Sequence, residues 1–145
     1  MFLSLNSRML ETKPELETRI EDAIARVFRD AFPKVPVHSY GNPGERSGKC
    51  VGLRAELGAE NPIGTNLYDC LVEIEARNFD APDRQLLHDM IGNASAAKET
   101  LSTHSAKLFS MPRGQAVEMI GAPRTVEDQN ERIITYSLSV TIQPI

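Results

Sequence analysis

The carboxylates best suited to chemistry lie in the segment YDCLVEIEAR, which runs from Tyr68 to Arg77. Apolar and polar residues alternate there, and this period of two predicts a β-strand with one buried face and one wet face. Asp69, Glu73 and Glu75 share the wet face with Arg77. Clustered carboxylates beside a cation could bind a divalent metal ion for a nuclease. A solvated strand face, or one that pairs with arginines of a neighbouring subunit, is the interpretation we favour.

The histidines and cysteines have no spacing that would build a zinc site. His38, His88 and His104 are isolated from one another and from both cysteines. His88 falls on an expected helix, where we interpret it as solvent-facing or partly packed. Cys50 and Cys70 take apolar positions of expected strands, which predicts buried thiols in a reducing compartment. Nucleophile-elbow, phosphate-loop and dinucleotide motifs do not occur in the sequence, so we expect no catalytic residue, metal or cofactor.

A Gly-rich stretch, GNPGERSG, runs from Gly41 to Gly48. Three glycines and a proline so close together cannot hold regular structure, which predicts a flexible loop or the tip of a long hairpin. Two interpretations stay open. The stretch is either a disordered connection or a contact loop in which Glu45, Arg46 and Lys49 become ordered when a partner arrives.

The last segment, ERIITYSLSVTIQPI, alternates a row of large apolar residues with a row of hydroxyls, Thr135, Ser137, Ser139 and Thr141. A strand face meant only for water usually includes Lys or Glu, which guard against unwanted strand pairing. This row carries no charge, so it is either a solvated face rich in strand-forming Thr or a contact surface.

The composition is that of a globular chain without general affinity for nucleic acid. Its 145 residues suffice for one continuous core, and 41% hydrophobic residues separate it from disordered chains. Sixteen Lys and Arg against 20 Asp and Glu give a net charge of −4, which opposes binding to phosphate backbones. The start, MFLSLNSRML, lacks a basic region and a cleavage site, and no run of ~18 apolar residues occurs. We expect no signal peptide and no membrane contact, and we expect a cytoplasmic place of synthesis.

The clearest element is a helix in TKPELETRIEDAIARVFRDAF. Thr12 can cap its start, Pro14 fits its first turn, and Pro33 ends it. Apolar residues recur every three or four positions and form one buried stripe. The opposite side, which includes Glu17 and Glu21, is expected to face solvent.

Two short strands are expected next, in KVPVHSY and GKCVGLRAEL, and Pro36 marks the first as short or at a sheet edge. The strand from Tyr68 to Arg77 follows. A second helix begins after Asp80, ends near Gly92 and precedes a less regular helical piece that spans residues 97–108.

The remaining elements are a strand, a loop and a turn. The strand is expected near residues 116–120 and the loop passes through Pro123. A polar turn at residues 127–130 then leads into the closing strand.

This order indicates a single α+β domain over residues 1–145. We expect an antiparallel or mixed β-sheet of about 4–5 strands, with the N-terminal helix and the second helix packed on one face. Residues 1–11 could form an extended N-terminal arm, and residues 41–48 a flexible loop.

The whole layout resembles the tail terminator, or tail completion, proteins of long-tailed bacteriophages and related head-to-tail joining proteins. The shared features are an amphipathic first helix, a hairpin with a long loop, a strand like LYDCLVEIEAR and a helix like DRQLLHDMI. The closing pair runs from AVEMIGAPRTVED through a polar turn into ERIITYSLSVTI. The resemblance implies that residues 83–91 form the helix packed on the sheet and residues 132–140 the terminal strand.

The resemblance implies a non-enzymatic virion protein that forms a homo-oligomeric ring, usually a hexamer, at the head-proximal end of the tail tube. Such a ring ends tube polymerisation and joins the tail to the neck or head. Its implied partners are other copies of itself, the tail tube protein and a neck or head-completion protein, while DNA only passes through the lumen. The protein would be made in the host cytoplasm and reside in the virion.

Two alternatives remain. Asp69, Glu73 and Glu75 resemble the Asp then Glu-x-Lys pattern of restriction-type nucleases, although Arg77 stands where that pattern has a lysine. The chain could also be a small dimeric binding module whose terminal strands pair across a two-fold axis.

Overall fold

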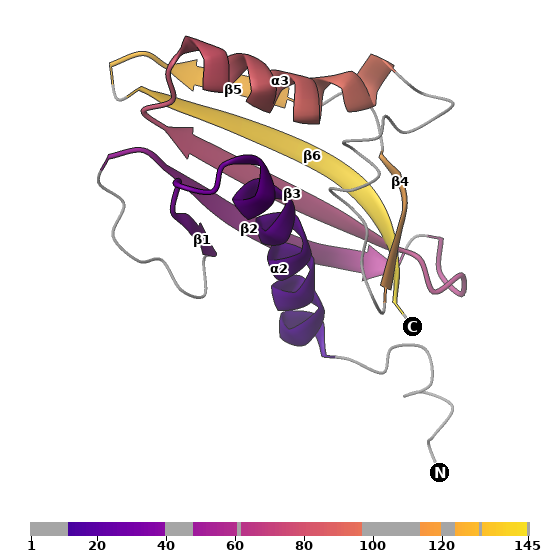
Figure 1. Cartoon of the computed structure of the whole chain (residues 1–145). Coiled ribbons are helices and arrows are strands. Elements are labelled where there is room, and N and C mark those ends of the chain that lie inside the picture. The colour runs from indigo at the N-terminus through magenta and orange to yellow at the C-terminus, as the bar shows by residue number, and fades with distance from the viewer. Residues whose placement is uncertain are drawn as a thin grey trace.

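In this computed structural model the described residues are 12–39, 48–60, 62–96, 114–119, 124–130 and 132–144. Their elements follow the order α2 (Lys13–Ala31), β1 (Val37–Ser39), β2 (Cys50–Glu60), β3 (Tyr68–Arg77), α3 (Ala81–Ala96), β4 (Gly114–Met119), β5 (Arg124–Asp128) and β6 (Ile133–Pro144). Figure 1 shows the strands as one twisted sheet with α2 and α3 packed against it. The expected α+β class with a mixed sheet and an N-terminal helix is confirmed.

The sheet has the strand order β1-β2-β3-β6-β4, and β5 also pairs with β6, so six strands take part among the described residues. All pairs are antiparallel except β1 with β2. Strand β6 is central, because β3 pairs along one of its edges. Strands β5 and β4 lie one after the other along the opposite edge of β6.

The parallel pairing of β1 with β2 overturns one expectation. Val37 lies beside Val51 and Ser39 beside Leu53, running in the same direction. A hairpin requires antiparallel strands, so residues 41–48 do not form a hairpin tip. Strand β1 is only three residues long and lies at the sheet edge, as Pro36 indicates.

Helix α2 begins as its sequence indicates. The Thr12 hydroxyl accepts a hydrogen bond from the Glu15 backbone N–H at 3.3 Å, and the helix ends at Ala31, before Pro33. The centre of its apolar stripe is buried, with Leu16, Ile20, Ile24 and Phe28 at or near zero exposure, and Val27 and Ala31 are partly buried.

Two acidic residues of α2 do not face solvent as expected. Glu21 is 8% exposed and accepts a hydrogen bond from the backbone N–H of Ala55 at 3.1 Å. The half-buried Glu17 accepts one from the backbone N–H of Leu57 at 2.7 Å. Strand β1 pairs with β2 only from Val51 to Leu53, so the next outward N–H groups need another acceptor. The carboxylates of α2 supply it and close that stretch of the sheet edge.

One face of the sheet, the core face, is apolar and carries both helices. Strands β2, β3 and β6 contribute aligned rows there, and α3 adds Leu87, Met90 and Ile91 to the residues from α2. The sheet rows are Val51, Leu53, Ala55 and Leu57; Cys70, Val72, Ile74 and Ala76; and Ile134, Tyr136, Leu138, Val140 and Ile142. Burial of each large side chain stabilises the fold by roughly 1.5–3 kcal/mol.

Helix α3 and strand β5 differ from the sequence-based expectation. Helix α3 continues past Gly92 to Ala96, and residues 97–108, expected to form a further helical piece, lie outside the described residues. Strand β5 occupies positions expected to be loop and turn, which leaves a turn at Gln129 and Asn130. All five residues of β5 are exposed, so the strand has no buried row that a sequence pattern could reveal.

Candidate functional site

The candidate site is the open face of the sheet, on the side opposite the two described helices. Strand β6 contributes Thr135, Ser137, Ser139 and Thr141 to this face, which follows from the burial of the alternate residues. Three of these hydroxyl residues are half-buried, and Ser139 is exposed. The sequence-based assignment of the two faces of β6 is confirmed.

The hydroxyl row lies beside a row of charged residues on β3. Asp69 is opposite Thr141, Glu73 is opposite Ser137, and Glu75 is opposite Thr135. Leu71 breaks the charged row opposite Ser139, and its side chain is 36% exposed. The open face therefore has short hydroxyls at its centre with charged residues beside them.

Two of the carboxylates on the open face pair with an arginine of their own strand. Glu75 accepts a hydrogen bond from the Arg77 guanidinium at 2.7 Å, and the Arg54 guanidinium lies 3.6 Å from the Glu56 carboxylate. Arg54 also lies directly opposite Glu73 across the β2–β3 pair. A partner that covers this face would meet two acidic side chains, Glu56 and Glu75, that are already paired with arginines.

The three carboxylates of the nuclease alternative are spread along one strand. Asp69 and Glu73 are separated by four positions, roughly 13 Å in a strand, and Glu75 is engaged by Arg77. Within the part of the chain that the structure describes, no group of three His, Cys, Asp or Glu residues could hold a metal ion.

Of the three residues expected in a contact loop, only Lys49 lies in the described part of the chain, since Glu45 and Arg46 are outside it. The Lys49 ammonium forms an ion pair with Asp83, lies 3.9 Å from the Asp80 carboxylate, and sits 5.3 Å from the centre of the Phe79 ring. Lys49 thus joins the start of β2 to the first turn of α3.

A polar contact that no sequence pattern indicates links α3 to β6. The Tyr136 hydroxyl is hydrogen-bonded to His88 Nδ1 at 2.8 Å, and His88 Nε2 lies 4.0 Å from Glu127. Burial raises the pKa of Tyr136 above its ordinary value, and the nearby Glu127 carboxylate adds to this shift. His88 is partly packed, as expected, and it satisfies a hydroxyl at the rim of the core.

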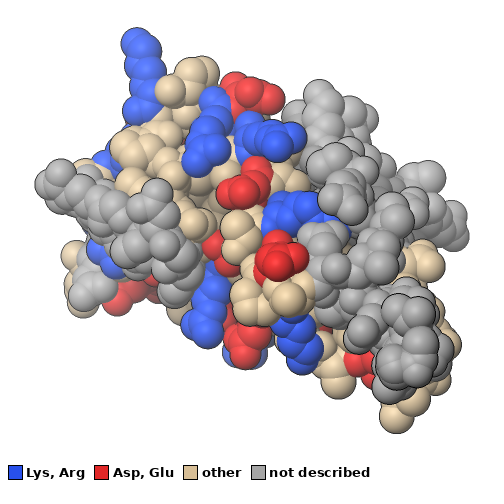
Figure 2. Space-filling model, turned by 90° about the horizontal axis from the view of Figure 1, so that it is seen from below, with Lys and Arg blue, Asp and Glu red and all other residues tan. Residues whose placement is uncertain are grey.

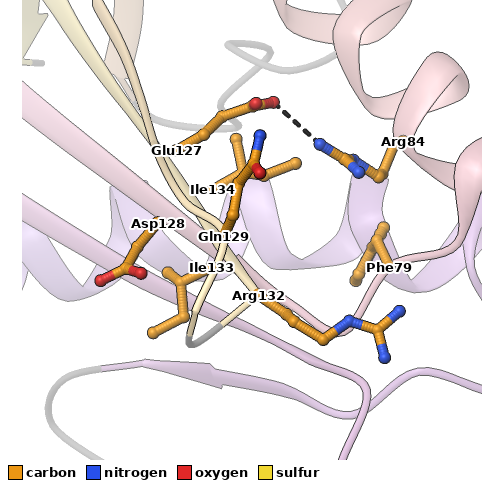
Figure 3. A pocket seen from close by; sticks show the side chains of 8 residues that line it. All are labelled: Phe79, Arg84, Glu127, Asp128, Gln129, Arg132, Ile133 and Ile134. Atoms are coloured by element: carbon orange, nitrogen blue, oxygen red, sulfur yellow. Dashed lines mark hydrogen bonds and ion pairs between the residues drawn. The ribbon is translucent and has the colours of Figure 1, made fainter.

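A pocket of about 300 Å³ lies where β3 leads into α3 and β5 turns into β6 (Figure 3). Its apolar lining is Phe79, Ile133 and Ile134, and its polar lining is Arg84, Glu127, Asp128, Gln129 and Arg132. The Arg84 guanidinium donates to Glu127 at 3.0 Å across one side of the opening. Five of the eight residues that line the pocket are therefore polar or charged.

Both cysteines are free and buried, as expected. Cys70 lies opposite Leu57, roughly 20 Å along β2 from Cys50, and a disulfide needs Cα atoms within about 7 Å. Burial, with the charge of Glu17, raises the pKa of the Cys70 thiol to about 12. This thiol is poorly suited to act as a nucleophile.

The described surface has no single-sign patch in the view of Figure 2, where basic and acidic side chains alternate. Neither described helix is long and apolar enough to cross a membrane.

Comparison with protein-family models and with curated proteins finds no match for this chain.

Proposed function

We propose that this chain is a structural component of a long-tailed phage, a tail terminator that forms a ring at the head-proximal end of the tail tube. The observation that carries the proposal is the open face, on which β6 presents an uncharged hydroxyl row beside the charged row of β3, where Glu75 is paired with Arg77. Such a face suits contact with another protein better than chemistry on a small substrate.

Covering the open face with another protein has a small free-energy cost. Serine and threonine hydroxyls donate and accept hydrogen bonds, so a partner backbone or side chain of either kind can satisfy them. When a partner covers the ion pair of Arg77 and Glu75, neither of these two charges is left alone. A lone buried charge would carry a large desolvation cost. Short side chains also lose little rotamer freedom on contact.

The proposed partners are further copies of the chain, the tail tube protein and a neck or head-completion protein. The ring would end tube growth and join tail to neck in the virion, after synthesis in the host cytoplasm. The net charge of −4 favours a lumen through which DNA passes without sticking, since attraction to phosphates would slow its passage.

The test is the mass of the purified protein, measured by light scattering after size-exclusion chromatography, together with negative-stain micrographs. We expect a closed ring for the natural sequence and its loss in a Ser137→Lys, Ser139→Lys double variant. A matched control places lysine at Thr18 and Gln85, two exposed neutral positions on the helices. The control should form rings, and its circular dichroism and that of the test variant should be unchanged.

A strictly monomeric protein at high concentration would contradict the proposal, and so would equal loss of assembly in both lysine variants. A mass of two subunits would favour the dimeric module. Magnesium-dependent cleavage of DNA that disappears in an Asp69→Ala variant would favour the nuclease instead.

A further inference from the structure

The hydroxyl row of β6 has opposite charges on its two sides at the level of Ser137. Glu73 of β3 and Arg124 of β5 are both opposite Ser137 in the register of the sheet. Residues directly opposite one another share a face of the sheet, so all three side chains lie on the open face. Neighbouring strands are about 4.8 Å apart, which places Glu73 and Arg124 roughly 10 Å from each other with a short hydroxyl between them.

Both charges are available to a partner. Among the described residues, no ion pair or hydrogen bond engages the side chain of Glu73 or that of Arg124. Arg54 lies opposite Glu73 on β2, but it pairs with Glu56 of its own strand. Glu73 is half-buried and Arg124 is exposed, so a surface that covers the open face would meet both of them.

The row of residues at Ile133 repeats this change of sign in the opposite order. Arg77 of β3 and Asp128 of β5 are both opposite Ile133. Arg77 already pairs with Glu75, so this row contributes less to a contact than the row at Ser137. In the row between them, Glu75 on the β3 side is matched by the uncharged Val126 on the β5 side. None of these three rows has the same charge on both sides of β6.

This pattern makes the open face complementary to itself. A two-fold rotation about an axis along β6 brings two open faces together and places the β3 side of each copy over the β5 side of the other. Glu73 of each copy then faces Arg124 of the other, so the contact contains this pair twice. Sheets that pack face to face are about 10 Å apart, a gap that a glutamate and an arginine side chain can bridge together. Such sheets cross at about 30°, so the match is best near the middle of β6, where Ser137 lies.

We propose that two copies of this chain pair through their open faces around this axis, with Glu73 of each copy facing Arg124 of the other. The inference rests on the proposed contact between copies through the open face, and it adds that the two surfaces in contact are the same. The hydroxyls of Ser137 and Ser139 donate and accept, so two identical rows can hydrogen-bond to each other directly or through water. Each copy has one open face, so the pair is closed, and growth into a ring needs a second, different contact.

The test reverses the two charges in the full chain and measures the dissociation constant of self-association by analytical ultracentrifugation. Glu73→Arg places arginine against arginine at both contacts of the pair, and Arg124→Glu places glutamate against glutamate. Each change alone should raise the dissociation constant by about tenfold or more, because like charges in contact are costly. A variant with both changes should pair again, and so should an equimolar mixture of the two single variants, as one copy of each.

The matched control reverses two exposed charges on the outer side of α2. Asp22→Arg and Arg26→Glu should each leave the dissociation constant within about twofold. Circular dichroism should be unchanged in all variants, because neither Glu73 nor Arg124 belongs to the core. The variant with both open-face changes keeps any local effect of Glu73→Arg beside Arg54, so its recovery has to come from the contact between copies.

The outcomes separate this inference from the proposed function. Weak association of both single variants, with recovery in the double variant and in the mixture, would support the inference. Rings that form normally in both single variants would overturn the inference and leave the tail-terminator proposal standing. Pairs that show this recovery but never grow beyond two copies would support the inference and overturn the ring. A natural sequence that stays monomeric at high concentration would overturn both.

Discussion

The hydrogen bond from the Ala55 backbone N–H to the Glu21 carboxylate predicts how a change at Glu21 alters the free energy of unfolding. Glu21 lies on α2 with 8% of its surface exposed, and its carboxylate accepts the Ala55 backbone N–H at 3.1 Å. A Glu21→Ala change removes this acceptor, and the space left at a buried position gives water little access to the N–H. The backbone donor would then remain unsatisfied inside the protein.

The expected loss follows from that geometry. Leaving a buried donor without a partner costs about 1–3 kcal/mol of the free energy of unfolding. Glu21→Gln keeps an oxygen acceptor of similar reach and loses only the charge, so its loss should be about 1 kcal/mol or less. The measurement is urea denaturation followed by circular dichroism, at one protein concentration for all variants so that assembly affects each equally.

The matched control is Asp22→Ala, the next residue of the same helix, whose side chain is exposed. Its free energy of unfolding should stay within about 0.5 kcal/mol of the natural sequence. If Glu21→Ala and Asp22→Ala destabilise the protein equally, or if Glu21→Gln is as damaging as Glu21→Ala, the edge-capping role of Glu21 is refuted.

Two further predictions concern α3 and the alkaline range. Lys49→Met should lower the free energy of unfolding by about 0.2–1 kcal/mol, since the ion pairs with Asp83 and Asp80 are partly exposed, and the difference should shrink in high salt. Hydrogen exchange should show faster opening at the start of α3 in this variant, whereas Lys34→Met, an exposed control, should not. The pKa of the Cys70 thiol is raised from 9.0 to about 12, so the folded state holds its proton longer than the unfolded state and stability falls as pH rises through this range. In urea melts at several pH values, Cys70→Ala should make the fall of the free energy of unfolding with pH shallower, by at most about 1.4 kcal/mol per pH unit. An unchanged slope would contradict the raised pKa of Cys70.

The strands with one buried row could be predicted from the sequence because burial imposes the period-two pattern. The rows of β3 and β6 match their observed faces residue by residue, and Thr12 caps α2 as its sequence position indicates. Strand β5 could not be found in this way, since all its residues are exposed and its pairing with β6 depends on backbone groups. Its polar residues fit a turn equally well.

The roles of individual charged residues could not be predicted from the sequence, because their partners are distant along the chain. Glu17 and Glu21 occupy the polar side of an amphipathic helix, and only the short length of β1 makes that side face backbone donors of β2. Lys49 and Asp83 are 34 positions apart, and no local pattern joins them. The parallel direction of β1 could not be predicted either, since a Gly-rich stretch has the same composition in a hairpin and in a crossover.

The arrangement of the sheet edges restricts how copies of this chain can associate. On one side, β1 and the carboxylates of α2 occupy the outward groups of β2 that a further strand would need. Strand β6 pairs with β3 on one edge and with β5 and β4 on the other. Pairing of terminal strands across a two-fold axis would therefore first require β4 or β5 to leave β6, at the cost of their backbone hydrogen bonds. Contacts through the open face require no such loss, which favours them over strand exchange as the way in which copies associate.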